Sequence, residues 1–86
     1  MHYVYIIFSK KLNKKYIGYY SNLQSRLQEH NCGYNKFTSH GIPWKLVYYE
    51  IFNDQTDALN EEKFLKSGKG RDRLKFLLKN TMNKLK

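Results

Sequence analysis

The chain has 86 residues, with 16 lysines and arginines against 7 aspartates and glutamates and a formal net charge of +9. A chain of this length forms one small domain, which buries only about 60% of the surface exposed by its unfolded form. No apolar run approaches the ~20 residues that span a bilayer, the N-terminal residues lack the charged region of a signal peptide, and the single cysteine, Cys32, excludes an internal disulfide. We therefore expect a cytoplasmic protein that does not bind membranes.

Positive charge is concentrated at the two ends of the sequence. Residues 1–45 carry seven lysines and arginines and one acid, and residues 67–86 carry the same numbers. Residues 46–66 hold five of the seven acids. A basic body around an acidic insert suits a polyanionic partner. The alternative is that the lysines only solvate the surface, and charge alone does not decide between the two.

Three strands are predicted from runs of β-branched and aromatic residues, at residues 2–9, 15–20 and 44–52. The short polar connection at residues 10–14 makes the first two an antiparallel hairpin. Three helices are predicted, from a cap at Ser21 or Asn22 to Gly33, from a cap at Asn53 or Asp54 through Lys66, and over residues 71–79. Residues 67–70, rich in glycine, are expected to separate the last two.

The order strand–strand–helix–strand–helix–helix predicts an α+β fold, with a three-stranded antiparallel sheet flanked by helices. No internal repeat or long linker divides the chain. We expect a single domain over residues 1–80 and a frayed C-terminal tail at residues 81–86.

Four residues of the first two strands and the first helix carry groups that metal-assisted cleavage of a phosphodiester needs. Arg26 and His30 lie one turn apart on the helix, and Tyr5 and Tyr16 lie on adjacent strands. Each has an ordinary alternative: the arginine can extend along the surface, the histidine can favour a helix C-terminus, and strand tyrosines usually pack. Their occurrence together in one basic domain is what points to a nuclease.

A carboxylate on the second helix completes this set. Glu62 follows Ala58 and precedes Leu65 at helical spacing, so it falls among apolar positions, where an unpaired charge is costly to bury. It should therefore have a cationic partner, either a metal ion or an arginine. Spacing alone does not separate Glu62 from Glu61, and either could instead form a solvated pair such as that of Glu62 with Lys66.

Basic residues in the hairpin, the central loop and the last helix are candidates for contacts with nucleic-acid phosphates. They are Lys14, Lys15, Lys36, Lys69, Arg71 and Arg73. Residues 67–70 could present backbone N–H groups to a phosphate at the start of a helix, although they do not form a Walker loop. The alternative is a plain helix break with solvated lysines.

Five segments in order resemble the motifs of the GIY-YIG nuclease superfamily, in particular its small single-domain members, which are similar to the N-terminal domain of excision nuclease C. They are Tyr3-Val-Tyr5, Tyr16-Ile-Gly18, and residues 23–31, 41–50 and 58–66. The resemblance covers residues 2 to about 78, nearly the whole chain.

The resemblance implies a role for each candidate. Tyr16 would activate or orient the attacking water, with Tyr5 beside it. Arg26 would hold the scissile phosphate and stabilise its developing charge, and His30 would transfer a proton or contact the phosphate. Glu62, rather than its neighbour, would bind one divalent cation, Mg²⁺ or Mn²⁺.

Three positions depart from the pattern of the superfamily. Tyr3 replaces a glycine, Tyr19 stands where many members have a lysine, and Leu74 falls near a late asparagine that many nuclease members carry. The leading interpretation is a metal-dependent endonuclease that hydrolyses DNA, structure-selective or weakly specific, in DNA repair or recombination. RNA is an alternative substrate, and a protein partner or a homodimer would supply any further specificity.

Two other interpretations remain open. The chain could be a catalytically weak or inactive DNA-binding module on the same scaffold, which the departures at Tyr19 and Leu74 favour. It could also be a small adaptor whose aromatic residues, Tyr19, Tyr20, Tyr34 and Phe37, contact another protein.

Overall fold

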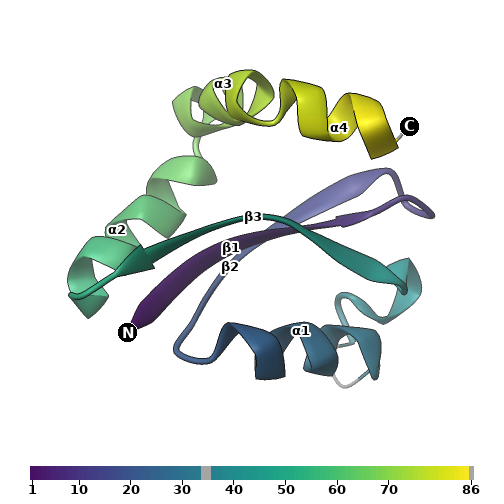
Figure 1. Ribbon diagram of the computed structural model, residues 1–86, viewed down its shortest axis with the longest axis horizontal. Helices are drawn as coiled ribbons and strands as arrows, with labels where there is room; N and C mark the ends of the chain where they lie inside the picture. Colours follow the sequence, from purple (N-terminus) through teal and green to yellow (C-terminus); the bar gives the residue numbers. More distant parts are fainter. Residues whose placement is uncertain (34–35, 86) are drawn as a thin grey trace.

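Figure 1 shows the protein as a computed structural model, which describes residues 1–33 and 36–85. The elements follow in the order β1 (His2–Ser9), β2 (Lys14–Tyr20), α1 (Leu23–Asn31), a 3-10 turn (Ser39–Gly41), β3 (Trp44–Phe52), α2 (Gln55–Leu65), α3 (Gly68–Leu77) and α4 (Lys79–Leu85). The predicted α+β class is confirmed.

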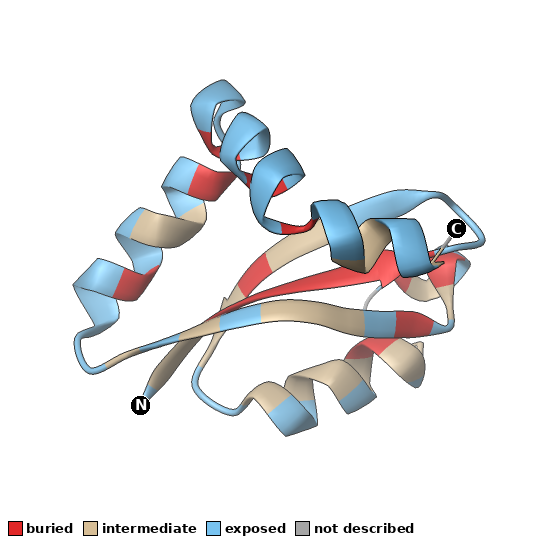
Figure 2. Ribbon diagram, turned by 45° about the horizontal axis from the view of Figure 1, so that its top comes forward, coloured by how far each residue is buried: buried red, intermediate tan, exposed pale blue. Residues whose placement is uncertain are grey.

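The sheet has the strand order β2-β1-β3, with antiparallel pairing on both sides of β1. Strand β1 is buried along most of its length (Figure 2), since neighbouring strands flank it and helices cover both faces. This explains why its sequence is almost continuously apolar rather than alternating. Strands β2 and β3 form the two edges of the sheet.

Helix α1 covers one face of the sheet, and α2, α3 and α4 lie on the other (Figure 1). Side chains therefore divide between two cores. The core under α1 contains Tyr5, Ile7 and Trp44, and the opposite core contains Val4, Ile6, Ala58, Leu65, Leu74 and Leu78. Among the helices of the described residues, none combines the length and the apolar character needed to cross a membrane.

The boundary between α2 and α3 is tighter than the sequence predicted. Helix α3 begins at Gly68, so only Lys66 and Ser67 separate the two helices. A Cβ on Gly70 would lie 2.5 Å from the Cα of Leu65, so the close approach requires glycine at this position. The Ser67 hydroxyl accepts a hydrogen bond from the Gly70 N–H at 3.2 Å. One of the backbone N–H groups predicted to bind a phosphate is therefore already bonded within the chain.

The prediction of a frayed tail is wrong for residues 81–85, which belong to α4. Met82 packs against the core that contains Leu78, and its N–H donates to the Leu78 carbonyl at 2.8 Å. This contact of the partly buried Met82 with the core anchors the segment, although no residue of α4 is fully buried. The local sequence, in contrast, is mostly polar.

Candidate active site

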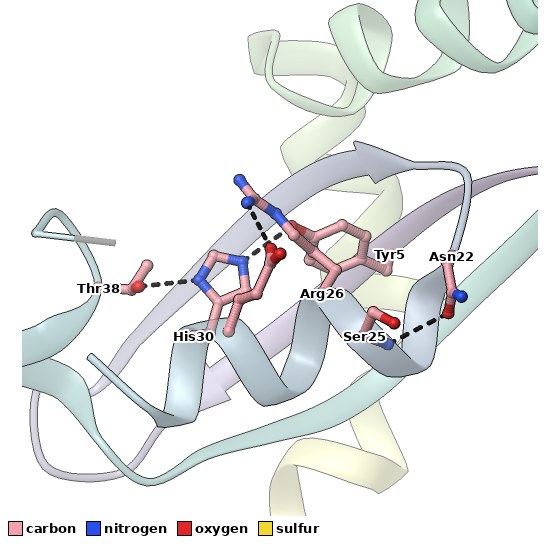
Figure 3. A network of polar contacts seen from close by, with 7 residues as sticks. Tyr5, Asn22, Ser25, Arg26, His30 and Thr38 are labelled. Carbon is pink, nitrogen blue, oxygen red and sulfur yellow. Dashed lines mark hydrogen bonds and ion pairs between the residues drawn. The ribbon is translucent and has the colours of Figure 1, made fainter. Parts of the chain in front are cut away.

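Tyr5 of β1 lies at the centre of a chain of hydrogen bonds under α1 (Figure 3). Its hydroxyl lies 2.9 Å from His30 Nε2 and accepts a hydrogen bond from Arg26 Nε at 3.3 Å. On the other side of the imidazole, His30 Nδ1 lies 2.8 Å from Thr38 Oγ1. Tyr5, His30 and Thr38 are buried, so three elements of the chain meet in one solvent-excluded network.

The protonation states of this network follow from its burial. Burial raises the pKa of Tyr5 to about 12, although the Arg26 charge opposes the rise. Burial also lowers the pKa of the His30 imidazole, and the Arg26 charge lowers it further. Both groups are therefore neutral at neutral pH. The assignment that gives each donor an acceptor has Tyr5 donating to His30 Nε2 and His30 Nδ1–H donating to Thr38.

Thr38 is a residue of this network that the sequence did not single out. Its carbonyl accepts hydrogen bonds from Trp44 Nε1 at 2.6 Å and from the Gly41 N–H at 3.0 Å. These bonds fix the loop so that the hydroxyl faces His30. The position lies in a polar loop, and no periodic pattern marks it as buried, so only the folded chain identifies it.

Gly18 of β2 makes room for the Tyr5 ring. The two residues are paired across the β1–β2 ladder. A Cβ on Gly18 would lie 2.5 Å from Tyr5 Cζ and 2.9 Å from Cε1, much closer than atoms in contact can approach. The glycine of the Tyr16-Ile-Gly18 motif therefore has a steric role in placing the phenol.

We expect Gly18→Ala to destabilise the protein by about 1–3 kcal/mol, because overpacking moves the ring from its place in the network. Urea unfolding measures the effect. Gly68→Ala is the matched control, since its Cβ would meet nothing within 4 Å. The control should not destabilise the chain, because alanine favours a helix over glycine by about 1 kcal/mol. Equal stability of the two variants would contradict the steric role.

One nitrogen of the Arg26 guanidinium, Nη2, remains available to a ligand. Besides its bond to Tyr5, its Nη1 donates to Glu29 at 3.0 Å, and its guanidinium lies 5.1 Å from the centre of the Tyr20 ring. Burial alone would lower its pKa, but the hydrogen bonds with Tyr5 and Glu29 raise it overall, so it stays cationic. Among the described residues, Nη2 has no hydrogen-bond partner.

Tyr16 of β2 touches the same network from the side. The edge of its ring packs against His30, with the ring centres 5.0 Å apart, and its ring centre lies 6.4 Å from that of Tyr5. Its side chain is half-buried. Within residues 1–33 and 36–85, its hydroxyl makes no hydrogen bond and is therefore available to a bound water or ligand.

Glu62 of α2 lies on the opposite face of the sheet from α1 (Figure 1) and pairs with Lys66 rather than with a residue of the network. Its carboxylate forms an ion pair with Lys66 at 3.2 Å and is close enough to contribute to the raised pKa of Tyr5. The described part of the chain has no group of three or more His, Cys, Asp or Glu side chains that could hold a metal ion. A single carboxylate still fits Mg²⁺, which keeps several waters and is completed by substrate phosphates.

The neighbouring Glu61 has a different environment. Burial of Glu50 on β3 and, after it, the neighbouring Glu61 raise the pKa of Glu50 to about 7, while Arg73 opposes this rise. Tyr48 belongs to the same cluster. The two adjacent glutamates therefore have different neighbours, which spacing alone could not resolve. Arg73, a predicted phosphate contact, lies near this acidic pair.

This cluster predicts a pH effect on stability. The pKa of Glu50 is higher in the folded than in the unfolded chain, so its contribution is fully present below its ordinary value of 4.5 and is lost as the pH rises toward about 7. Glu50→Gln should therefore gain stability relative to the natural chain as the pH rises through this range. His30 acts in the opposite direction, since its pKa is lowered, but it is present in both proteins.

Thermal unfolding of the two proteins at several pH values between 4.5 and about 7 measures this difference. Asp72→Asn, which changes an exposed carboxylate, is the control and should keep the pH dependence of the natural chain. An unchanged pH dependence in Glu50→Gln would contradict the prediction.

A cleft of about 400 Å³ opens between β2 and α3, next to the network. We call it the basic cleft, and it is lined by Lys15, Tyr16, Ile17, Lys66, Arg71, Leu74 and Lys75. Of the predicted phosphate contacts it contains Lys15 and Arg71, whereas Lys14, Lys36 and Lys69 are exposed outside it. Lys66 and Lys75 were missed, because nothing in their local sequence indicates that they share a cleft with β2.

Comparisons with known proteins identify relatives of this chain. The family model described as the GIY-YIG catalytic domain matches residues 1–75. A UPF0213 protein of Staphylococcus haemolyticus is 36% identical over 77 residues, which cover 88% of this chain and 93% of that protein. A UPF0213 protein of Pediococcus pentosaceus is 39% identical over 69 residues, covering 79% of this chain and 73% of that protein.

A solved structure shares the fold as well. The solution NMR structure of a UPF0213 protein from Bacillus halodurans is similar with a TM-score of 0.55 and 30% sequence identity, over 88% of this chain and 83% of that one. The family model covers most of the chain, including both tyrosine strands, α1 and α2. The chain therefore belongs to the GIY-YIG family.

Proposed function

We propose that the protein is a metal-dependent endonuclease that hydrolyses DNA phosphodiester bonds, structure-selective or weakly specific. Membership of the GIY-YIG family points to nuclease activity on a nucleic acid, and nucleases of this family generally depend on a divalent metal ion. The observation that carries the proposal is the hydrogen bond between the Tyr5 phenol and the Arg26 guanidinium, with the Tyr16 ring beside Tyr5. The Glu62 carboxylate, on the other face of the sheet, contributes to the raised pKa of Tyr5.

The environment of each side chain supports a role for it. The available hydroxyl of Tyr16 would orient the attacking water, and Arg26 Nη2 would bind the phosphate and stabilise its developing charge. Glu62 would hold one Mg²⁺ or Mn²⁺, which supplies Lewis-acid stabilisation of the phosphate when bound. Tyr5 and Arg26 are already joined by a hydrogen bond, so the guanidinium is held in place before a substrate arrives.

His30 is better suited to proton transfer and positioning than to direct contact with a phosphate. It is fully buried, and both ring nitrogens have partners, Tyr5 and Thr38. A neutral imidazole in this position can accept the Tyr5 proton at Nε2, which gives an imidazolium beside the phenolate, while its Nδ1–H stays hydrogen-bonded to Thr38. His30 would therefore act through Tyr5, within the range of roles that the family resemblance implies.

A catalytically inactive DNA-binding module is the second candidate, and one observation favours it. Leu74, which replaces the late asparagine of many nuclease members, is 3% exposed and belongs to the core, so it can supply no polar contact to a substrate. Tyr19 likewise has its hydroxyl bonded to His2 Nδ1 at 2.8 Å. The aromatic adaptor has less support: Phe37 is exposed, but Tyr34 lies outside the described residues.

A cleavage panel separates the first two candidates. The protein is incubated with nicked, flapped, branched and single-stranded DNA, and with RNA of matching sequence, in Mg²⁺, in Mn²⁺ and in EDTA. We expect strand breaks in at least one DNA with a divalent metal and none in EDTA. Salt-sensitive binding without breaks in any substrate would indicate the binding module, and preferential cleavage of RNA would overturn the assignment of DNA.

A further inference from the structure

The basic cleft brings together cations from three elements of the chain. Lys15 comes from β2, Lys66 follows α2, and Arg71 and Lys75 lie one turn apart on α3. Like charges gathered in one cleft repel one another, and they attract an anion from solution. Of the four, only Lys66 pairs with a carboxylate of the described chain, that of Glu62. Within residues 1–33 and 36–85, the other three cations form no ion pair.

The turn between α2 and α3 brings Arg71 close to Lys66. Gly70 allows α3 to start against the end of α2, where a Cβ would overlap the Phe64 carbonyl oxygen. The Arg71 N–H then donates to the Ser67 carbonyl at 2.9 Å, within the first turn of α3. The helix therefore begins directly beside Lys66, which places Arg71 next to it in the cleft.

The shape of the cleft suits a nucleic-acid backbone more than an isolated anion. Its volume, about 400 Å³, is larger than one phosphate group needs, and the apolar residues Ile17 and Leu74 belong to its lining together with the cations. A sugar–phosphate chain alternates charged and less polar groups in the same way. Tyr16 lines this cleft, and its ring packs against His30 of the hydrogen-bonded network, so the two sites are adjacent.

We propose that the basic cleft binds the sugar–phosphate backbone of DNA beside the phosphate that is cleaved. This inference rests on the proposed function, because it places the cleft next to the reacting group. Contacts to charge and sugar carry no sequence information, so binding here should be salt-dependent and independent of sequence. No metal ion is needed for it, since the cations of the chain supply the charge.

The experiment measures binding in EDTA, where cleavage does not interfere. The affinity for a short fluorescein-labelled DNA duplex with a single-stranded end is measured by anisotropy at several salt concentrations. The natural chain is compared with Arg71→Gln/Lys75→Gln. Each lost phosphate contact lowers the slope of log affinity against log salt by about 0.7–0.9, so we expect the slope to fall by about 1.5 and the affinity about tenfold or more.

The matched control is Lys45→Gln/Lys84→Gln, which removes the same charge from exposed residues outside the cleft. It should keep nearly the slope of the natural chain. Equal losses in both double variants would overturn the proposal, because net charge would then explain the binding. Unchanged binding in the cleft variant would overturn it too. Thermal unfolding shows whether both double variants are folded. If Arg71→Gln/Lys75→Gln is unfolded, the single variant Lys75→Gln, at an exposed residue, takes its place.

The outcome separates this proposal from the proposed function. DNA binding that depends on the cleft, together with no cleavage on any substrate, would contradict only the endonuclease. Cleavage by the natural chain, together with full binding by the cleft variant, would contradict only the assignment of the cleft.

Discussion

Glu62→Gln is expected to reduce metal-dependent cleavage of DNA by at least about 100-fold, since loss of even an outer partner of a metal ligand typically costs 10–100-fold. Glutamine keeps the size of the side chain but removes the charge that would hold the cation. Its partner Lys66 is exposed, so the change should cost little stability. Single-turnover cleavage of the best substrate from the panel measures the effect.

Glu61→Gln is the matched control, because it removes the same charge from the adjacent residue. Glu61 acts on the pKa of Glu50, whereas Glu62 acts on that of Tyr5. We expect this variant to cleave at nearly the rate of the natural chain. The assignment of the metal to Glu62 would be wrong if Glu62→Gln cleaved normally, or if both variants lost activity equally.

Tyr16→Phe should slow the chemical step by about 10²–10⁴-fold, the range in which positioned proton transfer contributes to catalysis. The substitution keeps the ring, which packs against His30 and Trp44. Within the described residues the hydroxyl has no hydrogen-bond partner, so its removal leaves no buried group unpaired. The rate should therefore fall while the unfolding free energy stays nearly unchanged, and single-turnover kinetics and urea unfolding measure the two.

Tyr49→Phe serves as the control for this second variant. Tyr49 is 51% exposed on β3, at the opposite edge of the sheet from β2. Loss of the phenol hydroxyl at this position should leave the rate of cleavage unaffected. A Tyr16→Phe protein that cleaves at the natural rate would exclude the hydroxyl from the reaction.

Strand and helix boundaries were predictable where the chain carries local signals. The third strand was predicted at residues 44–52 and is found there, because aromatic and β-branched residues follow the only proline. Two candidates were predicted for the cap of α1 and two for that of α2, and the structure shows Asn22 and Asp54 capping these helices through their side chains. The resemblance to the GIY-YIG nucleases is confirmed as family membership, and the α+β class is confirmed with it.

The remaining features depend on contacts between distant parts of the chain. Helix α4 forms because Met82 meets the core, and Thr38 matters because Trp44 holds its carbonyl. Lys66 and Lys75 join Lys15 only after α2 and α3 fold over β2. No window of local sequence contains these relations, so propensity and periodicity could not reveal them.

The central claim is that Tyr16, Arg26 and Glu62 serve one metal-assisted site. NMR spectra of the isotope-labelled protein during titration with Mn²⁺ test it most directly, because this paramagnetic ion broadens the signals of nearby nuclei even at low occupancy. We predict that the side-chain signals of Glu62, Tyr16 and Arg26 broaden first, and that Glu62→Gln abolishes the effect. Broadening that begins at the acidic pair on β3 and α2, or none at all, would contradict the account.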